Sequence, residues 1–255
     1  MVTLIYDGSW NGLLTTVFEI YERKLSNLSV ETTQHHQPSM FSTALTVHTD
    51  EVKAQRVWKG LKKYVSIETG MQLYAAFLSE IPDIGQTLCR YIQLTFERHA
   101  SPAGDYANPD VLRITQTSRM VHREKHRMEA FIRFQLTQDG LFFAGIEPDF
   151  NVIPLLLRHF KNRYADQRWL IYDIKRQYGI YYDLHTVEEI EINLSEKISF
   201  YGDRNSEIFH ADEALYQTLW KDYFKHINIT ERKNTKLHLQ HVPKRYWKHL
   251  TEKHN

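Results

Sequence analysis

The chain has 255 residues, of which 42% are hydrophobic and 25% charged, with a formal net charge of +1, and this balance is typical of a globular protein. No run approaches the roughly 20 apolar residues of a membrane-spanning helix, and the N-terminus has no secretory signal pattern, so no membrane association is predicted. The single cysteine, Cys89, excludes an internal disulfide and an all-cysteine metal or iron–sulfur site within one chain, and a reducing cytoplasm is the expected compartment.

The first hundred residues alternate short strand patterns with helical ones. Apolar residues recur at helical spacing after the Asp7-Gly8 turn, and Asp50 is a good N-cap residue for a later helix. Turn formers are concentrated in Ser101–Pro109, which we interpret as a linker. The predicted elements are strands at Thr3–Tyr6 and Thr43–His48, and helices at Asn11–Lys24, from near Asp50, at Gln72–Ser79 and at Ile84–His99.

The middle of the chain has a strand pattern. Met128, Ala130, Ile132, Phe134 and Leu136 alternate with mainly polar residues, which predicts a half-buried strand. A turn at residues 138–140, a returning strand at 141–147 and a helix at 151–164 follow. The segment 169–183 predicts two more strands joined at residues 177–179, and the segment 186–193 predicts a last one. This order predicts an antiparallel sheet with a helix on one side.

The C-terminal part again has a helical pattern, followed by a basic and aromatic end. Asp212 is the expected cap of a helix whose apolar face holds Tyr216, Trp220, Phe224 and Ile227. The predicted fold class is therefore α+β, in three parts: a mostly helical N-terminal part with short strands (1–105), a central antiparallel α+β part (106–200), and a helical, basic-aromatic C-terminal part (201–255).

Charge is segregated along the chain. Residues 183–220 carry 2 Lys/Arg against 9 Asp/Glu, whereas residues 221–255 carry 9 against 3. In the basic end, cations suit phosphates and aromatic faces suit unpaired bases, so a nucleic-acid contact is predicted there. The alternative is that Tyr246 and Trp247 anchor the end to the core while the lysines stay solvated. The predicted contacts are Arg232, Lys244, Arg245, Tyr246 and Trp247.

A second basic group lies in the middle of the chain. His126 and Arg127 belong to a run of cations, and the helix at 151–164 adds Arg158, His159 and Arg163. If that helix packs across the sheet, the two groups share an edge and form a phosphate track. The alternative is a solvated rim around an apolar sheet. His126, Arg127 and Arg163 are therefore further candidate nucleic-acid contacts.

The sequence assigns no catalytic residue, cofactor or metal. His122 and His126 have the spacing of two metal ligands on a helix, but no third ligand is identifiable. Among the acidic residues, Asp149 is expected to cap the following helix and Asp173 to pair with an arginine. Cys89 lies in a helical pattern, where a buried small hydrophobe is favoured over a nucleophile.

The chain resembles a family of bacterial proteins of unknown activity, described as probable DNA metabolism proteins. The resemblance lies in YDGSWNGLLTTVFEIYE (Tyr6–Glu22), EKHRMEAFIRF (Glu124–Phe134), and the segments Ile146–Asp183 and Leu219–Glu252, in that order. It implies a DNA-repair context, with a radical-SAM protein encoded nearby, and some family members are fused to a uracil-DNA-glycosylase-like domain. This chain ends just after the KRYW block and has one cysteine, so both iron–sulfur chemistries would belong to partner proteins.

Three functions follow from these patterns. The first is a DNA-repair accessory that binds nucleic acid or a radical-SAM partner. The second is an enzyme acting on damaged bases, with His126, His159, Glu147 or Asp173 in its site and tyrosines 178, 181 and 182 stacking on an extruded base. The third is a protein-only adaptor whose acidic segment Asp183–Glu213 docks a basic partner.

Overall fold

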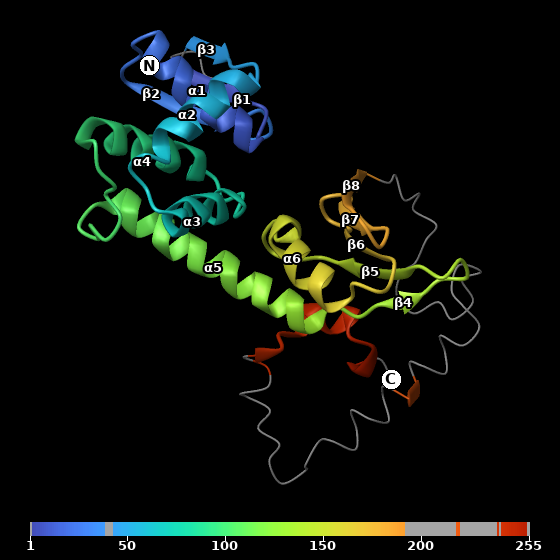
Figure 1. The fold of residues 1–255 in the computed structure, drawn as a ribbon. Coiled ribbons are helices and arrows are strands. Elements are labelled where there is room, and N and C mark those ends of the chain that lie inside the picture. Colours follow the sequence, from blue (N-terminus) through green and yellow to red (C-terminus); the bar gives the residue numbers. More distant parts are fainter. Residues whose placement is uncertain (1, 39–42, 192–217, 220–238, 240, 254–255) are drawn as a thin grey trace. The chain divides into compact units, whose positions relative to one another are not determined.

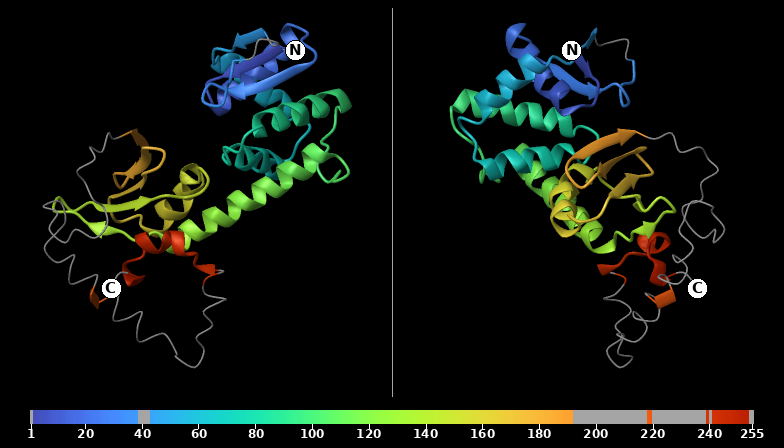
Figure 2. Two further views of the ribbon diagram at one scale, coloured as in Figure 1. Left: turned by 180° about the vertical axis from the view of Figure 1, so that it is seen from behind. Right: turned by 45° about the vertical axis from the view of Figure 1, so that its right-hand side comes forward.

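The computed structural model describes residues 2–38, 43–191, 218–219, 239 and 241–253, and Figures 1 and 2 show its helices and strands. Contacts divide the chain into two compact units, Met1–Arg123 and Glu124–Asn255. The predicted α+β class is confirmed, because both units combine helices with a sheet. Within the described ranges, no helix has the length and apolar character needed to cross a membrane.

The first unit contains a three-stranded parallel sheet with β1 in the centre. Leu4 of β1 lies opposite Val30 of β2 and Leu45 of β3, and Leu4 is completely buried. The strands and helices predicted for this region are confirmed. The strand β2 is an additional element that the sequence did not predict. The elements are β1 (Val2–Tyr6), α1 (Trp10–Glu22), β2 (Leu28–Thr32), β3 (Thr43–Thr46), α2 (Glu51–Leu61), α3 (Ile67–Phe77) and α4 (Ile84–Arg98).

Side-chain caps fix where the helices of the first unit begin. The Ser9 hydroxyl accepts a hydrogen bond from the Gly12 N–H at the start of α1. Asp50 accepts hydrogen bonds from the N–H groups of Val52 and Lys53, which confirms its predicted role. Behind these helices the core includes Cys89, which is fully buried, and burial raises the pKa of its thiol to about 12. The prediction that Cys89 is a buried hydrophobe is therefore confirmed.

The long helix α5 (Pro109–Phe131) corrects the prediction of a strand in the middle of the chain. The alternation that began at Met128 does not persist, because Ala130 is exposed while Met128 and Ile132 are both buried. Their spacing of four residues continues the buried positions Val111, Ile114 and Val121, which is the periodicity of a helix. The helix runs from the first unit into the second.

The second unit contains a five-stranded sheet in the order β4-β5-β6-β7-β8, with α6 against one face (Figures 1 and 2). The predicted order of strands and helix is confirmed from β4 to β8. The expectation of a fully antiparallel sheet is corrected at one pair: β5 and β6 are parallel, because α6 is the crossover connection between them. The elements are β4 (Gln135–Leu136), β5 (Phe142–Ile146), α6 (Ile153–Arg163), β6 (Trp169–Asp173), β7 (Tyr178–Tyr182) and β8 (Val187–Glu191).

Aromatic side chains fill the space between α6 and the sheet. Phe160 of α6 lies 6.2 Å from Trp169 of β6, and Trp169 lies 5.4 Å from Tyr182 of β7, measured between ring centroids. All three side chains are buried. Two short 3-10 helices, η2 (Lys244–His249) and η3 (Thr251–Lys253), complete the described part of this unit.

Candidate nucleic-acid interface

The C-terminal block, defined as Lys244–His249 (η2), is attached to α5 by Tyr246. This side chain is 1% exposed, and its hydroxyl lies 2.6 Å from both carboxylate oxygens of Glu124. Its ring packs against Phe131, with centroids 5.5 Å apart. Burial and the Glu124 carboxylate raise the pKa of Tyr246 far above its ordinary value, so the hydroxyl remains a hydrogen-bond donor. In this arrangement the ring is an anchor and is not accessible to a base.

Glu124 is the acceptor at the centre of this attachment. It lies on α5, its side chain is 1% exposed, and it also accepts the Asp149 backbone N–H at 3.0 Å. The Arg127 guanidinium donates to it at 3.4 Å. A buried carboxylate is stable only when such donors replace its lost hydration. Glu124 therefore joins three segments: α5, the chain after β5 and the C-terminal block.

Arg245 lies on the solvent side of the same cluster. Its guanidinium is 2.6 Å from the Asp149 carboxylate, donates to the Tyr246 hydroxyl at 2.7 Å, and lies 4.5 Å from the Tyr246 ring centroid. It is also 3.8 Å from Glu124. About half of the Arg245 and Asp149 side chains remains exposed, at 45% and 47%. Arg245 is thus both part of the attachment and accessible from solvent.

Other cations near the C-terminal end are also paired with carboxylates. Lys248 lies 2.6 Å from Glu147, and Arg133 of the second unit lies 2.8 Å from Glu252. Lys244 is exposed, and its ammonium group lies 6.0 Å from the ring centroid of Trp247. The Trp247 indole N–H donates to the Val242 carbonyl at 3.1 Å. Among the described residues, Lys244 is the predicted contact of this block with no carboxylate beside it.

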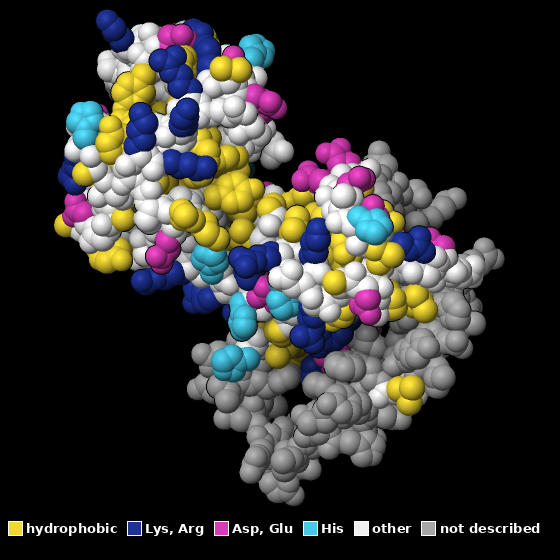
Figure 3. All heavy atoms as spheres, in the orientation of Figure 1, with side chains coloured by type: hydrophobic (Ala, Val, Ile, Leu, Met, Phe, Trp, Pro, Cys, Tyr) yellow, Lys and Arg dark blue, Asp and Glu magenta, His cyan; other side chains and the backbone are white. Residues whose placement is uncertain are grey.

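A contact between α5 and α6 brings together the two basic groups in the middle of the chain. The Glu129 carboxylate of α5 lies 2.6 Å from Lys125 and 3.8 Å from His126 on the same helix. It also lies 3.5 Å from His159 of α6. Figure 3 shows Lys, Arg and His side chains gathered over the C-terminal half of α5 and over α6. The two groups therefore border the same surface, with Glu129 between them.

The remaining predicted contacts occupy different environments. His126 is 86% exposed, whereas Arg127 is half-buried beside Glu124. Arg163 is exposed, and its guanidinium donates to the Tyr164 hydroxyl at 3.3 Å. Arg232 and the helix expected after Asp212 lie outside the described residues.

The acidic candidates have structural partners. The prediction that Asp149 caps the following helix is wrong, because that helix begins after Val152 with no side-chain cap, and the Asp149 carboxylate faces Arg245. The predicted pairing of Asp173 with an arginine is confirmed, since Arg176 lies 2.8 Å from it. Burial raises the pKa of Asp173, although hydrogen bonds from Arg176 oppose the shift. Asp173 also accepts the backbone N–H groups of residues 175 and 176, and so fixes the turn between β6 and β7.

Two of the three tyrosines considered for base stacking donate hydrogen bonds within the second unit. Tyr182 is buried, and its hydroxyl donates to backbone carbonyls of Ala165 and Leu184. Tyr178 donates to the Asn151 side chain. In the part of the chain that the structure describes, no three His, Cys, Asp or Glu side chains are placed to hold a metal ion.

The comparisons with known proteins identify a family. A family described as a domain of unknown function (DUF4130) has a sequence profile that matches residues 82–252, well over half of the chain. The chain therefore belongs to this family, and the match includes Glu124, Glu129, α6 and the C-terminal block. No curated protein matches the chain.

Proposed function

We propose that this protein is an accessory in DNA metabolism that binds nucleic acid through the junction surface of its second unit. The junction surface consists of Lys125, His126, Arg127, Arg158, His159 and Arg163. The observation that supports it most directly is the contact of Glu129 with His159, because it places α6 beside the basic end of α5. The two basic groups then form one surface instead of two separate rims.

The charge of this surface suits phosphate. The helix α6 contains no acidic residue, and its Arg158 and Arg163 side chains are exposed. Two carboxylates border this surface: Glu124 is buried beside Arg127, and Glu129 is 13% exposed beside Lys125. Neither is paired with Arg158 or Arg163 of α6, so the charge of these two arginines is available. Cations in this arrangement bind polyphosphates by releasing condensed counterions, which makes the affinity depend steeply on salt.

The C-terminal block extends the proposed contact. Lys244 is exposed, and Arg245 and Lys248 are exposed at 45% and 49% although both are paired with carboxylates. Ion pairs with this exposure typically contribute about 0–1 kcal/mol. A phosphate group therefore competes readily with Asp149 and Glu147 for these cations. Trp247, which is half-buried, provides an aromatic ring 6.0 Å from the Lys244 ammonium group.

The DNA-repair context and the partners come from the resemblance described above. On this proposal a radical-SAM protein, or a uracil-DNA-glycosylase-like protein, supplies the chemistry and this chain supplies nucleic-acid binding. The division of labour agrees with the cysteine content, because one cysteine does not ligate an iron–sulfur cluster. Co-purification of the two proteins, with and without nuclease treatment, tests that partnership.

The test of binding is fluorescence anisotropy with labelled single-stranded and duplex DNA over a salt series. We expect Arg158→Gln combined with Arg163→Gln to weaken binding, and to reduce the slope of log affinity against log salt by about 0.7 per lost contact on single strands. Lys175→Gln, which removes an exposed charge from the turn between β6 and β7, is the matched control. Equal affinities for the double variant and the wild type at every salt concentration would exclude the junction surface.

A second candidate function is that of a protein adaptor, and strand β8 favours it. This strand lies at the edge of the sheet in the described residues and exposes Glu188, Glu189 and Glu191. An acidic edge strand suits a basic partner segment. Salt-sensitive retention of a partner protein, lost in a Glu188→Gln and Glu189→Gln variant and accompanied by no DNA binding, would favour the adaptor.

A further inference from the structure

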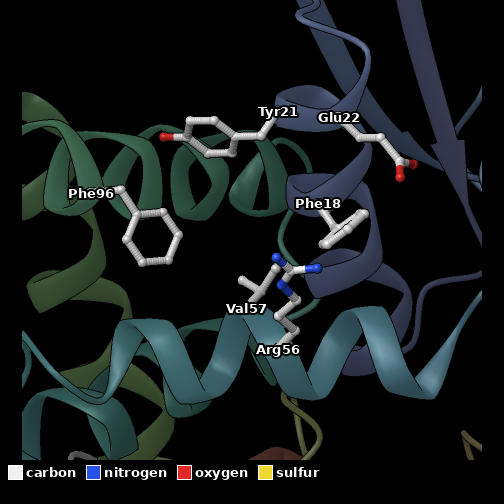
Figure 4. A pocket seen from close by; sticks show the side chains of 6 residues that line it. All are labelled: Phe18, Tyr21, Glu22, Arg56, Val57 and Phe96. Carbon is white, nitrogen blue, oxygen red and sulfur yellow. The ribbon is translucent and has the colours of Figure 1, made fainter.

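The first unit contains an open hollow of about 500 Å³ between α1, α2 and α4. Figure 4 shows that Arg56 extends from α2 into the space between the rings of Phe18 and Phe96. The hollow shares no residue with the junction surface, and most of its lining precedes the segment matched by the family. Its lining residues are Phe18, Tyr21, Glu22, Arg56, Val57 and Phe96.

Aromatic rings form the walls of the hollow and remain accessible. Tyr21 is 45% exposed, and its ring meets Phe96 edge to face with centroids 6.0 Å apart. Phe18 and Phe96 are half-buried. Phe96 lies close to the backbone of α2 at Gly60, where a Cβ atom would be 3.6 Å from the ring. Phe96 is therefore held against α2, and the exposed parts of the rings face the open side of the hollow.

Cations border these rings. The Arg56 guanidinium lies 5.6 Å from the Phe18 ring centroid. Two exposed lysines follow Arg56 along the chain: Lys59, three residues later on α2, and Lys63, in the turn after the end of the helix at Leu61. Within the described ranges none of the three has a carboxylate partner, and Figure 3 shows Lys and Arg side chains next to hydrophobic ones over α1 and α2.

The acidic residue that lines the hollow, Glu22, is paired with a lysine outside it. Glu22 lies 2.9 Å from Lys53, which also lies 2.6 Å from Glu19. In Figure 4 the Glu22 carboxylate is turned away from Phe96. The centre of the hollow therefore combines aromatic surface with the positive charge of Arg56.

We propose that this hollow binds an unpaired base of a single-stranded nucleic acid. The base packs into the corner formed by the edge-to-face rings of Tyr21 and Phe96, and the adjoining phosphates meet Arg56 and then the exposed lysines that follow it, Lys59 and Lys63. Aromatic walls beside a cationic track are the features by which proteins hold single strands without reading their sequence. A protein ligand would also bury the rings, but it would not by itself account for the Arg56 guanidinium beside them, which has no carboxylate partner among the described residues.

This assignment extends the proposed function to a second site, and its test separates the two sites. The probe is a single-stranded oligonucleotide that contains 2-aminopurine, whose fluorescence is quenched when it stacks on an aromatic ring. We expect Phe96→Leu to abolish most of the quenching and to lower single-strand affinity roughly tenfold, with a smaller effect on duplex DNA. Leucine retains an apolar contact over Gly60, and circular dichroism verifies that the variant is folded.

Substitutions on α2 and in the turn after it test the contribution of the cations without touching the core. Arg56→Gln and Lys63→Gln are each expected to reduce the salt slope for single strands by about 0.7. Lys62→Gln is the matched control, because this neighbouring lysine lies 5.1 Å from the Trp58 ring centroid, and neither residue lines the hollow. It is expected to leave 2-aminopurine quenching unchanged.

The outcomes discriminate between the two sites. Loss of quenching in Phe96→Leu, with normal binding in the Arg158 and Arg163 double variant, supports the hollow and counts against the junction surface. Normal quenching and affinity in folded Phe96→Leu and Arg56→Gln overturn the hollow, whatever the junction surface does. Retention of a partner protein that depends on Phe96, with unchanged single-strand affinity, would show a protein-docking site and also overturn the assignment.

Discussion

The cation in the hollow of the first unit and the cations of the C-terminal block in the second unit lie in different environments. Beside the hollow, the Arg56 guanidinium lies 5.6 Å from the Phe18 ring centroid and, among the described residues, has no carboxylate partner. In the second unit, Arg245 and Lys248 each lie 2.6 Å from a carboxylate. The sequence alone favours the C-terminal end as the phosphate-binding region, because the excess of Lys and Arg is concentrated there. Positive charge in a sequence therefore does not indicate which cations are available to a phosphate.

The buried carboxylates of the two units also differ. In the first unit, hydrogen bonds from Lys53 and Arg23 hold the pKa of Glu19 below its ordinary value. In the second unit, burial raises the pKa of Asp173 despite its pairing with Arg176. One carboxylate is thus stabilised in its ionised form, and the other is destabilised. Substitutions and pH changes that act on one unit and spare the other test these contrasts.

The largest effect is expected from removing the anchor of the C-terminal block. Tyr246→Ala removes a ring that is 1% exposed and deprives Glu124 of its closest donor. Truncation of a large buried aromatic side chain costs about 3–5 kcal/mol. We expect the block to detach, which frees Arg245 and Lys248 from their carboxylates and makes them resemble the cations of α2. Rapid tryptic cleavage at these two residues measures the detachment.

Tyr246→Phe isolates the contribution of the hydroxyl. The ring stays in contact with Phe131, while Glu124 loses a hydrogen bond, at a cost of about 1–3 kcal/mol. Its tryptic cleavage should therefore be intermediate between the wild type and Tyr246→Ala. If Tyr246→Ala resisted trypsin as well as the wild type, the anchoring role would be wrong.

Most of the fold was predictable because local patterns determine it. Helices with side-chain caps, such as Asp50, and strands beside turn formers were placed within a few residues. The segment at Met128 was assigned to a strand because its alternation was judged over few residues. The helical period of α5 becomes visible only when Val111, Ile114 and Val121 are included. The strand β2 was missed because its sequence, LSVET, has one fully buried residue, Val30, and no run of apolar residues.

The candidate site was predictable in residue type but not in arrangement. Lys244, Arg245, Tyr246 and Trp247 were singled out by their composition, yet the role of Tyr246 depends on Glu124, which is 122 residues away in the chain. Glu124 is not among the predicted contacts, because the segment around it is characterised by its cations. Its signal was available in the helical period, since it follows the buried Val121 by three residues and precedes Met128 by four. A charged residue at a buried position of a helix predicts a specific partner.

An intermediate effect is expected from pH, with opposite signs in the two units. The lowered pKa of Glu19 means that its contribution to stability is present above its unfolded value of about 4.5 and is lost as pH falls through the folded pKa. The raised pKa of Asp173 means that its contribution is present below about 3.8 and is lost as pH rises through the folded pKa. The cost of Glu19→Gln, about 1–3 kcal/mol at pH 7, should therefore shrink on acidification.

The cost of Asp173→Asn should change in the other direction, and be greatest at low pH. Hydrogen exchange followed by mass spectrometry measures both, because peptides from α1 and β6 report separately on the two units. The same pH trend for both variants would contradict the contrast between the carboxylates.

The smallest effect on stability is expected from Asp149→Asn, which makes the second unit resemble the first. The Asp149 side chain is 47% exposed, so losing its ion pair with Arg245 should cost less than about 1 kcal/mol. Its backbone N–H still bonds to Glu124, and the attachment of the C-terminal block is therefore preserved. Arg245 is then released from its competing carboxylate, and affinity for single-stranded DNA should rise.

The control for the change in net charge is Asp166→Asn, which replaces an exposed aspartate in the loop between α6 and β6. An equal rise in affinity in both variants would show that the effect comes from net charge alone. A rise confined to Asp149→Asn would show that Arg245 itself contacts the phosphate.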